Sequence, residues 1–342
     1  MEKKKRIFYL NFIRAISMLI IVTYHFNVHL AENNIQCIKI FSNGRLGMIG
    51  VTLFFMISGA ALMYNYGENI GLKHYFKKRF LGIYPMFWIA YILVFTYIFY
   101  GSKKIIWNLP IYKLIISLFA MDGYLSPYTE TFYLIGEWFL GCIVLIYILF
   151  PLLRILINKY PKRFLMIYTV LDILLLGFYR DGIMPINKNI FICTYSFVIG
   201  MYIIKYIKEF KVWQFCICLL LSICAYFIPN SNNLNLNTAI ANFIGINLFF
   251  VLGFIGEKIH NIEIQNCFNI MSKYSYTVFL VHHYIIMKIE NSFANTSLRI
   301  SETITLYITC WIVISICAKI LYIFNKNVTQ VLAKKEESKN IN

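Results

Sequence analysis

The sequence predicts an all-α integral membrane protein, a bundle of ten transmembrane helices with one further short helix that is outer or re-entrant. Of its 342 residues, 60% are hydrophobic and 14% are charged, whereas a soluble domain has roughly 45–50% apolar and about 25% charged residues. Ten apolar runs approach or reach the length of about 20 residues that a helix needs to cross the hydrocarbon core. Short basic clusters separate these runs, as in multi-pass membrane proteins.

The first run follows the basic residues 3–6 and resembles a signal peptide. No small-residue cleavage site follows it and Arg14 interrupts it, so we interpret it as an uncleaved first span. The predicted spans, in chain order, are 7–30, 45–66, 80–100, 132–157, 164–179, 189–207, 212–229, 239–256, 270–289 and 303–324. The run 109–121 is shorter and contains Lys113, so we predict that it lies at the outer surface or re-enters.

The distribution of positive charge predicts the orientation. If ten runs cross and both termini are cytoplasmic, 21 of the 32 Lys and Arg residues fall inside and nine fall outside. That excess agrees with the positive-inside rule and would largely cancel if 109–121 also crossed. We therefore expect a multi-pass protein of the cell membrane, with one transmembrane domain over 1–325 and a polar, disordered cytoplasmic tail over 326–342.

The net charge of +17 does not indicate nucleic-acid binding here, because the basic residues are those of the loop clusters. The nine cysteines show no C-x-x-C spacing, and most lie in apolar runs where a thiol behaves as a small hydrophobic group. Neither a disulfide framework nor a metal site is expected, and we predict no permanently bound cofactor.

Two polar residues of the first span suggest a catalytic or ligand-binding role. Arg14 and His25 are eleven residues apart, about three helical turns, so they share one face about 16 Å apart along the axis. A cation near the inner side suits a phosphate, and a neutral imidazole near the outer side accepts a proton from a hydroxyl. A snorkelling Arg14 and a merely interfacial His25 are the structural alternative.

These residues lie in a pattern that resembles the membrane acyltransferase-3 family, whose first helix carries an Arg, ten intervening residues and a His. The stretch 50–59 is similar to the family's G-V-x-x-F-F-x-x-S-G motif, and 275–282 to its S-Y-x-x-Y-L-x-H motif. Weaker matches begin at Lys78 and at Trp138. The resemblance runs from about residue 6 to residue 324 with its motifs in the expected order.

The resemblance implies an O-acetyltransferase that moves acetyl from acetyl-CoA, or another acyl-CoA, to a hydroxyl of a cell-surface polysaccharide or its lipid-linked precursor. It implies His25 as the catalytic residue and Arg14 as a donor-binding residue, with membrane lipid around the protein. Lys78 and Arg79 are similar to a basic donor-binding motif of the form R-R-x-x-R, but its last basic position is Gly82 here. If Lys78 and Arg79 bind the donor, they do so with fewer positive charges than the family motif has. The alternative is that they are ordinary basic residues flanking a span.

Four further residues are candidates for supporting or acceptor-side roles. Ser58, with Gly59, is expected mainly to permit close packing on the first helix. Glu137, beside Trp138, is a candidate for orienting His25. His282 matches a family position, and a structural role for it is as well supported as a functional one.

Three other functions compete with acyl transfer. A transporter or flippase for a glycan precursor would use the intramembrane Arg and His as a substrate path, but we find no paired halves with broken helices. A glycan polymerase would be expected to have a larger outer loop than 101–131. A structural scaffold leaves Arg14 and His25 unexplained.

Overall fold

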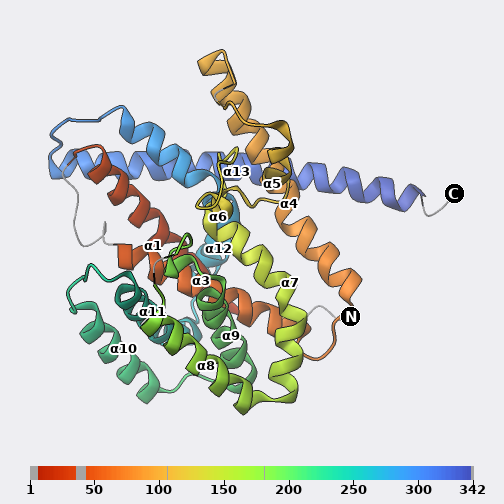
Figure 1. Ribbon diagram of the computed structural model, residues 1–342, viewed down its shortest axis with the longest axis vertical. Helices are drawn as coiled ribbons and strands as arrows, with labels where there is room; N and C mark the ends of the chain where they lie inside the picture. The colour runs from red at the N-terminus through yellow and green to blue at the C-terminus, as the bar shows by residue number, and fades with distance from the viewer. Residues whose placement is uncertain (1–6, 36–43, 106, 181, 340–342) are drawn as a thin grey trace. The chain divides into compact units, whose positions relative to one another are not determined.

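The computed structural model describes residues 7–35, 44–105, 107–180 and 182–339, with side chains up to residue 330 (Figure 1). It is 80% helix, and the described residues contain no strand. The prediction of an all-α protein is therefore confirmed. The basic cluster of residues 3–6, on which part of the predicted orientation depends, lies outside the described residues.

Each predicted span overlaps one helix, although the bounds differ by several residues at some ends. These helices are α1 Phe8–Glu32, α3 Gly44–Tyr66, α4 Leu72–Ser102, α7 Trp138–Lys159, α8 Pro161–Phe178, α9 Ile190–Tyr206, α10 Val212–Tyr226, α11 Leu234–Lys258, α12 Ile262–Asn291 and α13 Ile300–Lys339. By length and composition, six are apolar enough to cross a membrane: α1, α3, α4, α7, α11 and α13. The chain is thus a multi-pass membrane protein, while ten crossings and cytoplasmic termini stay predictions.

The run 109–121 does not form a spanning helix. It contains the 3-10 turn η1 (Ile111–Lys113) and the five-residue helix α5 (Leu114–Leu118), and α6 (Asp122–Leu125) follows. The backbone of Ala120 is left-handed, with φ of 58°, which ends the helical path there. Lys113 donates hydrogen bonds to Thr129 Oγ1 and to the Glu130 carbonyl, both at 2.9 Å.

The expectation of a disordered tail differs from the structure, because α13 continues through most of 326–342 and ends at Lys339. The tail sequence contains four Lys and two Glu, which are residues of high helix propensity. An apolar helix that precedes such a sequence can continue into it without a new nucleation step.

The chain divides into two compact units, and three helices have residues in both. Unit 1 contains residues 1–28, 37–70 and 142–275, and unit 2 contains 29–36, 71–141 and 276–342. Helix α1 enters unit 2 at His29, α7 enters unit 1 at Cys142, and α12 enters unit 2 at Tyr276.

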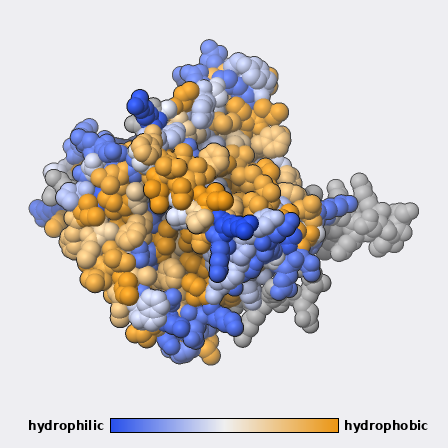
Figure 2. Space-filling model, turned by 60° about the horizontal axis from the view of Figure 1, so that its bottom comes forward, coloured by the Kyte–Doolittle hydropathy of each residue, from blue (hydrophilic) through white to orange (hydrophobic). Residues whose placement is uncertain are grey.

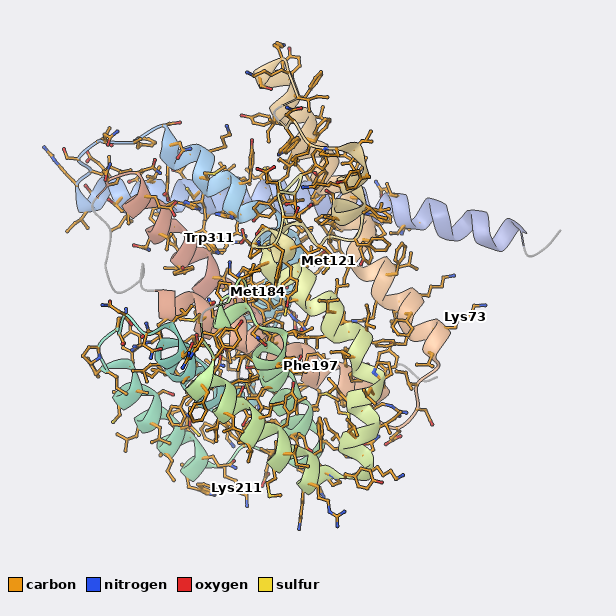
Figure 3. The ribbon with its side chains drawn as sticks, viewed as in Figure 1. Lys73, Met121, Met184, Phe197, Lys211 and Trp311 are labelled. Atoms are coloured by element: carbon orange, nitrogen blue, oxygen red, sulfur yellow. The ribbon has the colours of Figure 1, made fainter. Side chains whose placement is uncertain are left out.

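Unit 1 is built around the close approach of α3 and α9. A Cβ at Gly59 would lie 2.0 Å from the Phe197 carbonyl oxygen, and one at Gly200 would lie 2.0 Å from that of Met56. Phe197 is fully buried on α9 (Figure 3). The expectation that Gly59 permits packing on the first helix is therefore wrong in its partner, since it is Gly50 that faces Ile21 of α1.

In unit 2, α4 packs along α13 and also contacts the short helical segment that ends in α5. Tyr84 and Trp88 of α4 donate hydrogen bonds to the carbonyl groups of Phe119 and Leu118. These bonds satisfy backbone groups just where α5 ends.

Large apolar side chains remain exposed along several helices of both units, and hydrophobic residues cover much of the face shown in Figure 2. Ile312, Ile316 and Ile320, for example, are each more than half exposed on α13 and recur at the four-residue spacing of one helix face. An apolar exposed surface of this kind suits contact with lipid.

Candidate functional site

Helix α1 holds Arg14 within a polar network of unit 1. The Arg14 guanidinium donates to Ser272 Oγ at 3.2 Å and to Asn11 Oδ1 at 3.4 Å. Ser272 also donates to Asn11 Oδ1 at 3.2 Å, and the Asn11 amide donates to Asn269 Oδ1 at 2.8 Å. Asn11 of α1 and Ser272 of α12 are neutral hydrogen-bond acceptors that orient the guanidinium.

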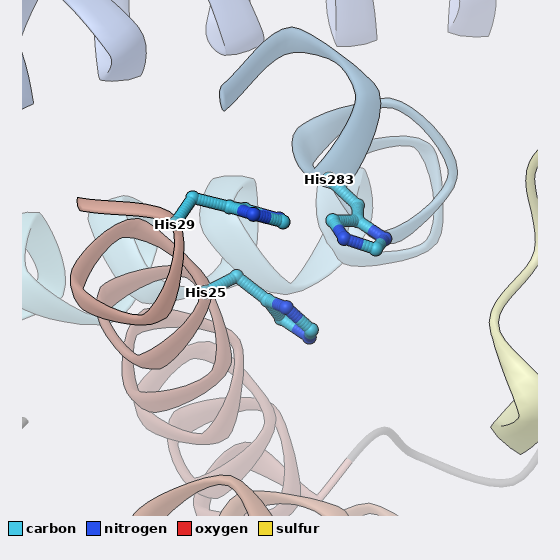
Figure 4. Close-up of side chains that lie close together, drawn as sticks. All are labelled: His25, His29 and His283. Carbon is cyan, nitrogen blue, oxygen red and sulfur yellow. The ribbon is translucent and has the colours of Figure 1, made fainter. Parts of the chain in front are cut away.

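His25 lies on the same helix, three turns beyond Arg14, and both side chains are half-buried. Continuous helix between them confirms that the two residues share one face. The His25 ring lies edge-on to Tyr24, with ring centroids 5.1 Å apart. His29 follows one turn later on the same face of α1 (Figure 4).

A cluster in unit 2 surrounds His29, and it consists of His29, Glu32, Tyr133, Glu137 and His283. The rings of His29 and His283 stack, with centroids 4.7 Å apart and planes 21° from parallel (Figure 4). His29 Nδ1 is 2.6 Å from Glu32 Oε2, and His283 Nδ1 bonds to Glu137 Oε1. We call this group the histidine–carboxylate cluster.

Glu137 is the centre of the cluster's hydrogen bonds. Besides His283, it accepts a hydrogen bond of 3.1 Å from the Tyr133 hydroxyl. Burial and the neighbouring Glu137 carboxylate both raise the pKa of Tyr133, so this phenol stays protonated and can donate. A carboxylate held against an imidazole fixes the orientation of the ring and raises its basicity.

The backbone before α7 places Glu137. Gly136 has a φ of 85°, a left-handed conformation that disfavours residues with a side chain. A Cβ there would also lie 2.9 Å from Phe87 and 3.0 Å from Leu140. Gly123 of α6 approaches the same segment, because a Cβ on it would lie 2.8 Å from the backbone of Glu137.

Asp122 is buried beside this segment. Its carboxyl accepts a hydrogen bond of 3.0 Å from Ser117, and burial raises its pKa to about 6. Its side chain is 1% exposed, so it belongs to the packing that supports α6.

The other predicted residues occupy varied environments. His282 is fully buried, and its Nδ1 lies 2.9 Å from the Phe279 carbonyl oxygen and 3.1 Å from that of Val278. Lys78 is exposed and Arg79 half-buried, both near the start of α4. Trp138 is half-buried as the first residue of α7, and Ser58 is half-buried on α3. Among the described residues, the Ser58 hydroxyl has no base as a hydrogen-bond partner.

Sequence reasoning assigned no role to four members of the histidine–carboxylate cluster, namely His29, Glu32, Tyr133 and His283. The spacing of His25 and His29 by four residues was the available signal for one of them, since it places both imidazoles on one helix face. Glu32 follows His29 by three residues, which also suits a contact within one helix. Nothing in the sequence indicated Tyr133.

These features define a multi-pass helical membrane protein whose first candidate span carries an Arg and a His on one face. Comparison with known families identifies the class: the chain belongs to the acyltransferase-3 family, whose acyltransferase domain matches residues 7–323. The earlier resemblance to this family is thereby confirmed.

Acyltransferase MdmB from Streptomyces mycarofaciens is similar to this chain. The two sequences are 26% identical over 120 residues, which make up 34% of this chain and 31% of that protein. The match thus spans about a third of the length of this curated relative. No solved structure matches the chain.

Proposed function

We propose that this membrane acyltransferase is an O-acetyltransferase of the cell membrane. It transfers acetyl from acetyl-CoA to a hydroxyl of a cell-surface polysaccharide or of its lipid-linked precursor. The observation that carries the proposal is the pairing of Arg14 and His25 on one face of α1, in a chain whose residues 7–323 match an acyltransferase domain.

His25 is the catalytic base in this proposal. Its imidazole removes the proton of the acceptor hydroxyl while that oxygen attacks the thioester carbonyl carbon. The C–S bond then breaks, and the imidazolium returns the proton to the departing CoA sulfur. Direct transfer of this kind needs no acyl-enzyme; a covalent acyl-histidine is the alternative route.

Arg14 holds the acyl-CoA donor. Eleven residues of helix separate it from His25 by about 16 Å along the axis, so an extended donor with a phosphate at Arg14 can present its thioester toward His25. A guanidinium suits phosphate because it forms paired, charge-assisted hydrogen bonds. Lys78 and Arg79 are assigned to the same donor as additional cations at the start of α4.

Glu137, Trp138 and His282 are assigned to the acceptor side, with Glu137 as a positioning residue. Its described hydrogen bonds hold His283 and Tyr133 in place. The proposal that it also orients His25 is retained, because a carboxylate partner would raise the basicity of the imidazole. Ser58 is assigned a packing role.

The test is transfer of labelled acetyl from acetyl-CoA in membranes that contain His25→Ala or Arg14→Ala. The His25 variant should lose about 100-fold or more of the rate, the range of a general base. The Arg14 variant should mainly raise the KM for acetyl-CoA, with partial recovery in Arg14→Lys. His260→Ala is the matched control, because that histidine is exposed and lies between α11 and α12.

Mass spectrometry of the surface glycan, with and without the protein, identifies the acceptor and the acyl group together. Loss of an acetyl-sized increment supports the proposal. A wild-type rate in well-inserted His25→Ala protein contradicts the assigned mechanism, and an unchanged glycan contradicts the acceptor class.

A further inference from the structure

Unit 2 contains an apolar cavity separate from the histidine–carboxylate cluster residues. It has a volume of about 410 Å³ and lies among α4, α12 and α13, with walls that include Leu93, Ile285 and Leu321. The volume falls within the roughly 300–1,000 Å³ of typical small-molecule sites. None of its lining residues has a role in the proposed acyl transfer.

Two polar groups stand out in this apolar lining. The Tyr284 hydroxyl is buried and has no hydrogen-bond partner in the described part of the chain. Lys288, one turn further along α12, is exposed and is the charged residue among those that line the cavity. Its ammonium lies 5.8 Å from the centroid of the Tyr284 ring.

The tyrosine is held in position by packing. The Tyr97 ring of α4 meets the Tyr284 ring edge-on at a centroid distance of 6.2 Å. Aromatic pairs of this geometry are stabilising, so the hydroxyl is fixed inside the cavity wall. A buried hydroxyl without a partner is unfavourable unless a bound molecule supplies an acceptor.

We propose that this cavity binds a net anionic phospholipid. One acyl chain occupies the apolar volume, the Tyr284 hydroxyl donates to an ester or phosphate oxygen, and the Lys288 ammonium pairs with the phosphate. The charge argument selects this occupant, because the cavity has a cation and no anion among its lining residues. A zwitterionic phospholipid offers the same phosphate, but its ammonium group finds no anion among the lining residues and stands near the Lys288 cation.

Binding of dioleoyl phosphatidylglycerol and dioleoyl phosphatidylcholine to the purified full-length protein, followed by native mass spectrometry, tests the proposal. The wild-type protein should bind phosphatidylglycerol at least tenfold more tightly than phosphatidylcholine. Lys288→Gln should lose this preference, and Tyr284→Phe should weaken phosphatidylglycerol binding severalfold. Leu93→Trp, which fills the cavity, should lose the site for both lipids.

Lys103→Gln is the matched control. That lysine also lies over a tyrosine ring, 3.8 Å from the Tyr100 centroid, but it is not part of the cavity lining. The lipid preference of the Lys103→Gln variant should equal that of the wild-type protein. Thermal melting of each variant shows whether it is folded, and the Tyr284→Phe variant keeps the aromatic packing if Lys288→Gln fails to fold.

Equal affinity for the two lipids, or an unchanged preference in Lys288→Gln, overturns the proposal. Binding of an isoprenoid phosphate in place of phosphatidylglycerol overturns the phospholipid assignment and indicates a lipid-linked acceptor instead. Because the readout is lipid binding, failure here leaves the acetyl-transfer assay unaffected.

Discussion

The contact between α3 and α9 allows a quantitative prediction for Gly59→Ala. The new Cβ would lie 2.0 Å from the Phe197 carbonyl oxygen, whereas ordinary contact begins at 3.4 Å. The helices must therefore separate locally by about 1.4 Å. The obstacle is a backbone atom of a helix, so it cannot rotate away as a side chain would.

Overpacking of this kind costs about 1–3 kcal/mol, and the rigidity of the obstacle places Gly59→Ala at the upper end. At about 2–4 °C per kcal/mol for a domain of 150–250 residues, the melting temperature should fall by roughly 6–12 °C. Gly200→Ala should behave in the same way, because its Cβ would meet the Met56 carbonyl oxygen at the same distance.

Thermal unfolding of detergent-purified protein, measured by intrinsic fluorescence, is the assay. Gly177→Ala is the control: this glycine lies in α8, also in unit 1, and a Cβ on it would meet nothing within 4 Å. Alanine there should leave the melting temperature unchanged or raise it slightly, because it favours helix more than glycine does. Equal melting temperatures for the Gly59 and Gly177 variants would refute the close-contact reasoning.

Three further predictions concern buried polar groups. Arg45→Ala should destabilise the protein by about 3–5 kcal/mol in denaturant unfolding, because the buried guanidinium donates to two backbone carbonyls and to Asn237; a loss below 1 kcal/mol would contradict this. Glu290→Met should raise the melting temperature, since both oxygens of this fully buried carboxyl lack hydrogen-bond partners among the described residues; an unchanged or lower midpoint would count against it. Burial raises the pKa of Asp122 from 3.8 to about 6, so the folded state binds the proton more tightly and stability should fall as pH rises from about 4 to 6. Asp122→Asn should remove that part of the pH dependence of the melting temperature, and parallel profiles for the two proteins would show that Asp122 does not cause it.

The positions of the long helices were predictable because each is marked by a continuous apolar run in its own stretch of sequence. A run such as 239–256 is apolar over its whole length, and it corresponds to α11. The common face of Arg14 and His25 follows from the helical period alone. The expectation of a disordered tail over 326–342 also used local composition alone, and this composition did not reveal that α13 would continue into the segment.

The histidine–carboxylate cluster was not predictable, because it depends on tertiary packing. His282 and His283 are adjacent, and sequence reasoning selected His282 from its match to a family motif. Neighbouring positions on a helix point about 100° apart, so packing decides which one meets other helices. In the structure, His282 bonds to carbonyl groups of its own helix, whereas His283 stacks on His29 and bonds to Glu137.

The left-handed turn at Gly136 has a consequence for how Glu137 can be altered. The backbone conformation of Gly136 fixes the position of the Glu137 Cα, and so limits where the Glu137 carboxylate can lie in any rotamer. A change to glutamine at 137 would swap the functional group while its Cα stays in place. A bulkier residue at position 136 would move the Glu137 carboxylate without changing its chemistry. Substitutions at 136 and 137 therefore test separately where the carboxylate lies and what it does.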